Sequence, residues 1–231
     1  MPVKLIISYD DTDNDRDALA LARLLAYPGA ALALAYVRHV QEPDRAREAH
    51  ERSHAQALLE HGAKLLGDPD TPRHIVLHAS TGEGLLELAA RAQADVIVFG
   101  SDYRTAQGAV VPQASAQRLL HGGTVAVAIA PAGLRAQAKS SIGRIRVLGE
   151  AGDDAPAVTA QTLAGTLGAS ITEHNGGPAD LLVVGSREGA PTGRVELSAA
   201  AEYVVETAHA PVLVVPSGAP VRFEARAPTS V

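Results

Sequence analysis

Short apolar runs alternate with longer segments of helical periodicity through the first 130 residues of the chain. This alternation predicts strands and helices in turn, which is typical of βαβ units around a parallel sheet. The predicted strands are residues 5–9, 31–37, 73–78, 96–99 and 125–130, and the predicted helices are residues 15–26, 44–66, 83–91 and about 112–121. Strands 96–99 and 125–130 are apolar at every position, as a strand covered on both faces must be.

The chain also repeats itself. Residues 96–101 (Val-Ile-Val-Phe-Gly-Ser) resemble residues 181–186 (Leu-Leu-Val-Val-Gly-Ser), 85 positions later. The same separation relates Gly108 to Gly193, Val110 to Val195, Ala116 to Ala201 and Pro131 to Pro216. Residues 4–10 line up with residues 144–150 at a separation of 140. The second copy therefore lacks 140 − 85 = 55 residues, which hold the equivalents of the long helix, the third strand and the third helix.

This repeat predicts a full domain over 1–131, a linker over 132–143, a truncated domain over 144–216 and a C-terminal tail over 217–231. In the second copy we expect strands at 145–148, 169–173, 181–184 and 212–215 and helices at 155–167 and 196–208. We expect the last strand of each copy, 125–130 and 212–215, to pair antiparallel, since a bare apolar edge favours aggregation.

The connector 174–180 is shorter than the dozen or more residues that a parallel crossover usually takes. It therefore either lies extended across the end of the sheet, or the strand before it is short, displaced or antiparallel. The tail is expected to be mobile or to lie over the surface.

Charge and composition narrow the function classes. Lys plus Arg number 20 and Asp plus Glu number 26, which gives a net charge of −6 and argues against nucleic acid or an anionic membrane as partner. No Cys is present, which excludes disulfides, thiolate catalysis and Cys-ligated zinc. No apolar stretch approaches the roughly 20 residues of a spanning helix, and the N-terminus lacks a signal sequence, so we expect a cytoplasmic protein.

Polar and glycine positions at two predicted strand ends are candidates for a binding site. Gly100 and Ser101 end one strand, and Asp10 ends another. Ligands bind in open parallel sheets beyond the carboxyl ends of the strands, where backbone N–H groups and a helix N-terminus suit a phosphate. A glycine needed only for a strand-ending turn explains the local pattern equally well.

These motifs, taken with their order, resemble the universal stress protein family. The resemblance rests on Asp10-Asp-Thr12, Gly100-Ser101, residues 108–112 (Gly-Ala-Val-Val-Pro) and residues 125–131, and in the second copy on residues 185–187, 193–195 and 210–216. It implies two flavodoxin-like, adenine-nucleotide-alpha-hydrolase-like parallel sheets with a pseudo-two-fold relation. The strand order is 3-2-1-4-5 in the first, and the second sheet is shortened. It also implies pairing through the last strands and binding of ATP or AMP, with Mg²⁺ beside the nucleotide.

Nucleotide-binding members of this family carry the pattern G-x2-G-x9-G-[ST]. Carried over, the resemblance places Asp10 and Val37 on the adenine and ribose side, Gly100 and Ser101 near the ribose and phosphate, and Gln113, Ala114 and Ser115 around the phosphates. Thr12 and Gly108 complete the predicted nucleotide-binding set. Three positions depart from the pattern, namely Tyr103, Gln113 and Ala114. A side chain in place of glycine can block the approach of the backbone to phosphate.

Two other motifs suggest metal chemistry. Residues 50–54 (His-Glu-Arg-Ser-His) fit H-E-x-x-H, but the helix is charged all round and a third ligand is not evident, which favours a solvated face over zinc. Residues 11–15 begin like a calcium loop, but Arg16 stands where that loop needs glycine, which favours an acidic helix cap. Neither Gly-x-Ser-x-Gly nor a Walker motif occurs.

The prediction is a non-catalytic stress-response regulator, with at most slow ATP hydrolysis, whose first domain binds an adenine nucleotide. Its expected partners are that nucleotide and other proteins or a second copy. A nucleotide-free interaction or scaffold module is the alternative, and a small hydrolase or zinc-binding protein is a third.

Overall fold

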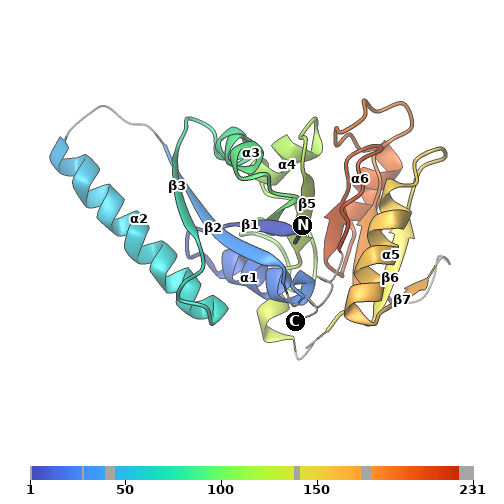
Figure 1. Ribbon diagram of the computed structural model, residues 1–231, viewed down its shortest axis with the longest axis horizontal. Helices are drawn as coiled ribbons and strands as arrows, with labels where there is room; N and C mark the ends of the chain where they lie inside the picture. Colours follow the sequence, from blue (N-terminus) through green and yellow to red (C-terminus); the bar gives the residue numbers. More distant parts are fainter. Residues whose placement is uncertain (1, 28, 40–44, 138–140, 173–177, 224–231) are drawn as a thin grey trace, which may run out of the picture.

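The computed structural model describes residues 2–27, 29–39, 45–137, 141–172 and 178–223, without the side chains of 45–48 (Figure 1). Its strands form one sheet in the order β3-β2-β1-β4-β5-β9-β8-β6-β7. The strands are β1 (Lys4–Ser8), β2 (Ala31–Arg38), β3 (Arg73–Leu77), β4 (Val96–Gly100), β5 (Ala126–Ala130), β6 (Arg144–Leu148), β7 (Ser170–Thr172), β8 (Leu181–Val184) and β9 (Val212–Val214). The helices are α1 (Asp13–Leu25), α2 (Arg45–Leu66), α3 (Thr81–Ala92), α4 (Ala114–Leu120), α5 (Ala155–Leu167) and α6 (Ala199–Glu206), with a 3₁₀ turn η1 (Leu134–Ala136).

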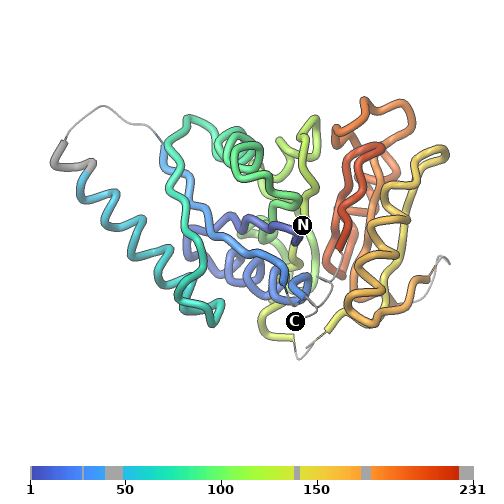
Figure 2. The backbone as a smooth tube through the Cα atoms, viewed as in Figure 1, coloured from blue at the N-terminus to red at the C-terminus, as the bar shows by residue number. Residues whose placement is uncertain are grey.

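Each half of the sheet is parallel, and the two halves meet at an antiparallel junction. The first half has the order 3-2-1-4-5, as predicted. The antiparallel pairing of β5 with β9, which places Ala128 opposite Leu213, is also confirmed. Figure 2 shows the consequence in space: the blue-to-green half of the chain lies on one side of this junction and the yellow-to-red half on the other.

The helices cover the two faces of the sheet in matched sets. Helices α1, α2 and α5 pack on one face, where Leu21, Leu59 and Leu163 belong to one buried cluster. Helices α3, α4 and α6 pack on the other face, with Leu85 and Leu119 in a second buried cluster. Because α1 matches α5 and α4 matches α6 in the repeat, the pseudo-two-fold axis passes through the sheet at the β5–β9 junction.

Loops from each half reach into the other. The amide of Val110 donates a hydrogen bond to the carbonyl of Ala208 at 2.9 Å, and the amide of Val195 donates to the carbonyl of Gly123 at 2.8 Å. These two hydrogen bonds are related by the repeat, because both donors and both acceptors are 85 residues apart. The halves are therefore joined by exchanged main-chain contacts as well as by the strand pairing.

The shortened second half keeps parallel pairing at its outer edge. Strand β7 has three residues and pairs parallel with β6, so the short strand that we predicted is present and the antiparallel alternative is wrong. Because β7 has only three residues, the connector to β8 has only a short distance to run back along the sheet. Residues 173–177 of that connector lie outside the described residues.

Among its described residues the second half has no helix equivalent to α3, and a sheet residue beneath that position differs. Ile6 of β1 is buried in the cluster under α3. The repeat places Arg146 of β6 at the same position, on the face opposite its buried neighbour Ile145. A long polar side chain thus replaces an apolar one where no helix covers the sheet.

The tail begins as a strap rather than as a loose end. Residues 221–223 lie alongside α5 and are hydrogen-bonded to it. Thr159 Oγ1 accepts from the amide of Val221 at 2.9 Å, and Thr162 Oγ1 accepts from the amide of Phe223 at 3.2 Å. The Phe223 ring is 1 % exposed and meets the edge of the Tyr27 ring, with 6.5 Å between centroids. Since Tyr27 follows α1, the strap ties the second half to the first. The tail was expected to be mobile or to lie over the surface; over these residues it is packed instead, because Val221 and Phe223 belong to the buried cluster on this face.

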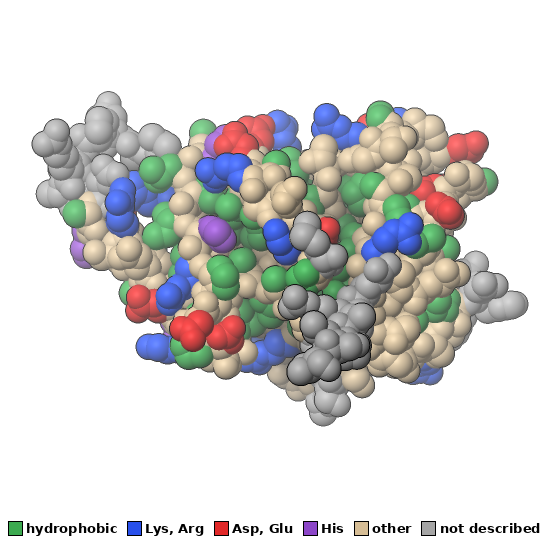
Figure 3. Space-filling view, in the orientation of Figure 1, with side chains coloured by type: hydrophobic (Ala, Val, Ile, Leu, Met, Phe, Trp, Pro, Cys, Tyr) green, Lys and Arg blue, Asp and Glu red, His purple; other side chains and the backbone are tan. Residues whose placement is uncertain are grey.

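The surface seen in Figure 3 intersperses basic and acidic side chains with apolar ones, so neither sign of charge dominates this face. Within the described residues, no helix is both long enough and apolar enough to cross a lipid bilayer.

Candidate functional site

The loop between β1 and α1 is held in a fixed, strained conformation. Asp11 has φ 64°, in the left-handed region of backbone conformation that residues other than glycine rarely adopt. Thr12 caps α1: its hydroxyl accepts from the amide of Asp15 at 3.2 Å and donates to the Asp15 carboxylate at 2.7 Å. Asp15 also accepts from the amide of Asp10 at 3.1 Å, which closes the loop. The acidic residues 11–15 therefore form a helix cap, as predicted in place of a calcium loop.

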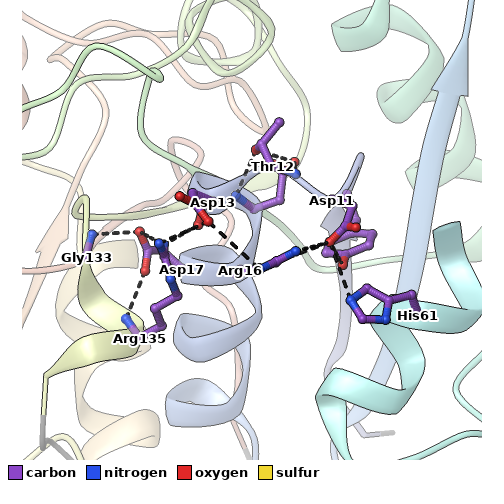
Figure 4. A network of polar contacts seen from close by, with 10 residues as sticks. Asp11, Thr12, Asp13, Arg16, Asp17, His61, Gly133 and Arg135 are labelled. Carbon is purple, nitrogen blue, oxygen red and sulfur yellow. Dashed lines mark hydrogen bonds and ion pairs between the residues drawn. The ribbon is translucent and has the colours of Figure 1, made fainter.

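Asp11 is the centre of a polar network that joins β1, α1 and α2 (Figure 4). Its Oδ1 accepts from the Tyr9 hydroxyl at 2.7 Å and from Arg16 Nη2 at 3.0 Å, and His61 Nε2 lies 3.8 Å away. Partial burial of Asp11 disfavours its charge, but the hydrogen bonds from Tyr9 and Arg16 outweigh it and hold the pKa of Asp11 below its usual value. Burial, followed by the same hydrogen bond, raises the pKa of Tyr9. These contacts stabilise the strained backbone at Asp11.

Asp15 lies almost fully buried beneath this loop. Burial, and then the contact with the Asp10 carboxyl group, raises the pKa of Asp15 to about 8, against the opposite effect of the Thr12 hydroxyl. Asp15 thus favours its protonated form beneath the loop. Asp10 itself is exposed, so its side chain is available to a ligand.

Ser101 and Gly100 have structural roles at the end of β4. The Ser101 hydroxyl is buried; it donates to the carbonyl of Ala130 at 2.7 Å and accepts from the amide of Val111 at 3.2 Å. Ser186 does the same in the second half, with the carbonyl of Val215 at 3.0 Å. Gly100 lies beneath the first turn of α1 and leaves no room there for a side chain. The protein itself accounts for the Gly-Ser pair in both halves.

Val37 and Gly108 are also placed by the fold. Val37 is buried under Gly84 of α3, whose added Cβ would lie 3.3 Å from Val37 Cγ1. Gly108 has φ 82°, and its amide donates to the carbonyl of Ala132 at 2.8 Å. Gly193 repeats this turn, with φ 78° and a bond to Ser217 at 2.7 Å. The glycine is therefore required by the turn.

The remaining predicted residues, Gln113, Ala114 and Ser115, line a groove of about 610 Å³ between the N-termini of α3 and α4. The other lining residues are Ser80, Thr81, Gly82, Glu83, Asp102 and Arg118. Gly82 lets the helices approach, since its added Cβ would lie 3.0 Å from the carbonyl oxygen of Ser115. The first amides of a helix lack partners within it and carry partial positive charge, which suits an anion. We call this hollow the α3–α4 groove.

The structure thus brings together only part of the predicted set. Gln113, Ala114 and Ser115 share the α3–α4 groove, whereas Asp10 and Thr12 lie at the start of α1 and do not line it. Sequence reasoning missed the α3 side of the groove. A signal was available there, because Ser80 and Glu83 have the spacing of a helix capping box, and the Ser80 hydroxyl accepts from the amide of Glu83 at 3.4 Å.

The His-Glu-Arg-Ser-His motif lies on α2, on the other face of the sheet. His50, Glu51 and His54 line a hollow of about 450 Å³ with Tyr36, Arg38 and His39. Nowhere in the described part of the chain do three or more His, Asp or Glu side chains have the arrangement of a metal site. The residues that the structure places here do not support the zinc interpretation.

Comparisons with known proteins agree with the fold. The model of the universal stress protein family matches residues 3–131. A protein of unknown function from Pseudomonas aeruginosa is 14 % identical, with a TM-score of 0.61 over 93 % of this chain and 92 % of its own. A universal stress protein from Archaeoglobus fulgidus is also 14 % identical, with a TM-score of 0.56 over 92 % of this chain and 98 % of its own.

A universal stress protein in complex with cAMP is 23 % identical but covers 42 % of this chain and 75 % of its own, with a TM-score of 0.36. That likeness is too partial to bear on a ligand. No curated protein matches the chain.

Proposed function

Because the chain belongs to the universal stress protein family, we propose that its first half binds an adenine nucleotide, ATP or AMP, and regulates a stress response without catalysing a reaction. The α3–α4 groove is the observation that carries this proposal. Two helix N-termini face one hollow of a size suited to a small ligand. The hydroxyls of Ser80 and Ser115 add donors for phosphate oxygens. The Asp102 carboxylate suits Mg²⁺, which would offset its repulsion of phosphate.

The departures from the family pattern are compatible with this site. Tyr103, which replaces a glycine, is 71 % exposed and does not line the groove. Gln113 precedes α4, but its side chain makes no capping hydrogen bond to the helix. Replacing this side chain by hydrogen, as in Gln113→Gly, therefore removes no capping hydrogen bond. Asp10 does not line the groove, but its side chain is exposed, and we propose that its carboxylate accepts hydrogen bonds from the adenine or ribose.

The second half supports a scaffold role instead. Ser198, which replaces Gln113 in the repeat, caps α6 through the amide of Ala201 at 3.2 Å and donates to Glu150 Oε1 at 2.7 Å. This hydrogen bond joins the repeat equivalents of Asp10 and Gln113, and we expect it to disfavour a ligand there. A nucleotide-free scaffold for the whole chain remains the alternative, favoured by the structural roles of Gly100 and Ser101.

Isothermal titration of the purified full chain with ATP, AMP and cAMP, each with and without Mg²⁺, tests the proposal. We expect saturable binding of ATP or AMP, weakened several-fold by Asp10→Ala and strengthened by Gln113→Gly. Glu188→Ala, at the position in the second half that matches Tyr103, is the control and should leave the affinity unchanged. Failure of every nucleotide to bind would favour the scaffold. Rapid phosphate release from ATP would contradict a non-catalytic role.

A further inference from the structure

A second groove lies between α2 and strands β2 and β3, on the face of the sheet opposite α3 and α4. It comprises a hollow of about 540 Å³ near β3 and the hollow of about 450 Å³ near the histidines, and Arg38 lines both. We call it the α2 groove. None of its lining residues belongs to the α3–α4 groove, so the proposed nucleotide site does not explain it.

The hollow near β3 has an aliphatic floor. Leu59 of α2 is fully buried, Ile75 is partly buried, and Leu77 is 48 % exposed, one of only a few large apolar side chains exposed to that degree among the described residues. Ile75 and Leu77 point to the same side of the sheet because alternate residues of a strand share a face. Among the described residues that line this hollow none is aromatic, which favours a saturated hydrocarbon over a nucleobase.

Arginines line the walls above this floor. Arg38, Arg52 and Arg73 line the hollow, and Glu60 is the carboxylate among the described lining residues. Arg38 also contacts Glu51 of α2, with 3.8 Å between Nη1 and Oε2. The lining is therefore positive on balance in a chain whose net charge is −6. Guanidinium groups bind carboxylates and phosphates through paired hydrogen bonds.

The hollow near the histidines extends the same character. His39, His50 and His54 line it together with Arg38, and Glu51 is the acidic residue among the described lining residues. The Nδ1 atom of His39 lies 3.2 Å from the carbonyl of Ala79, which fixes this ring at the end of β2. An anionic head placed at Arg38 would lie between the arginines of one hollow and the histidines of the other, next to the aliphatic floor.

We propose that the α2 groove binds an organic anion with a saturated hydrocarbon body and one terminal carboxylate or phosphate. The head binds at Arg38 and Arg73, and the hydrocarbon body lies over Ile75 and Leu77. This combination explains why arginines and an exposed leucine are gathered at one place. It is independent of the nucleotide proposal, because the two grooves lie on opposite faces of the sheet.

Titration of the full chain with decanoate, decyl phosphate and decanol tests this proposal. We expect decanoate or decyl phosphate to bind at least tenfold more tightly than decanol, and the comparison of the two anions identifies the preferred head. Arg73→Gln should weaken anion binding about tenfold, and Leu77→Ser should weaken all three probes. Arg23→Gln, which removes an exposed arginine of α1 outside the groove, should change nothing.

Equal affinity for decanol and decanoate would overturn the proposal, as would equal effects of Arg73→Gln and Arg23→Gln, or no binding of any probe. Circular dichroism of each variant establishes that it is folded. Saturation with ATP should leave decanoate binding unchanged, and competition between them would contradict two separate sites.

Discussion

Gly100 lies so close to Asn14 that a Cβ atom on the glycine would fall 2.0 Å from the main-chain oxygen of Asn14. Gly100→Ala must therefore displace the first turn of α1, and we expect the free energy of unfolding to fall by about 3 kcal/mol, as in strong overpacking. Gly185→Ala is the matched control in the second half, where the added Cβ would lie 3.0 Å from a side-chain atom of Pro156. Urea unfolding should show a clearly smaller loss there. Equal losses of unfolding free energy in the two variants would mean that a clash with the Asn14 main chain destabilises no more than a clash with the Pro156 side chain.

Asp17 anchors the start of the linker to α1. Its fully buried carboxylate accepts from the amides of Gly133 at 2.7 Å and Arg135 at 2.9 Å, and lies 3.1 Å from Arg135 Nη1. Asp17→Ala leaves these amides without an acceptor, and we expect a loss of about 3 kcal/mol in urea unfolding. Asp13→Ala removes an exposed partner of the same arginine and should cost less than about 1 kcal/mol. A small effect of Asp17→Ala would show that water replaces the carboxylate.

The buried Asp15 predicts a stability that declines as the pH rises. Its pKa of about 8 in the folded protein exceeds the value of 3.8 expected when unfolded, so the folded state binds the extra proton between these values. The free energy of unfolding should therefore fall from about pH 4 to pH 8, by at most about 1.4 kcal/mol per pH unit. Asp15→Asn keeps an acceptor for the loop amides and should flatten this dependence. An unchanged pH profile in the variant would assign the dependence to other groups.

The Phe223 ring predicts that the strap contributes to global stability. Phe223→Ala removes a buried aromatic side chain, and we expect a loss of about 3–4 kcal/mol in thermal or urea unfolding. Arg222→Ala, at the exposed neighbouring position, should change stability by less than about 0.5 kcal/mol. Similar effects of the two substitutions would indicate that the strap does not pack in solution.

The repeat carried most of what could be predicted about the fold. The constant 85-residue separation identified β8 and β9 as the equivalents of β4 and β5. The need to cover two apolar sheet edges then predicted the antiparallel pairing of β5 with β9. The direction of β7 could not be predicted, because a connector of this length is compatible with several arrangements. Three residues of parallel pairing resolve the choice.

The candidate site was less accessible to prediction, because local motifs do not reveal which groups the protein itself uses. The Ser101 hydroxyl is hydrogen-bonded to the main chain of Ala130 and Val111, and both hydrogen bonds depend on tertiary packing. Likewise, Arg73 is brought to α2 only by the pairing of β3 with β2. The domain boundaries and the ligand-binding roles of the predicted residues stay predictions.

The replacement of Ile6 by Arg146 in the repeat has a consequence for how this chain can change over time. A dimer of identical subunits must accept every substitution twice, once on each side of its axis. Here the two partners of the β5–β9 junction occupy different positions of one sequence, so one side can lose a helix and carry an arginine on its sheet while the other keeps its apolar residue and its helix. Because both halves lie in one chain, each can change without giving up the shared edge.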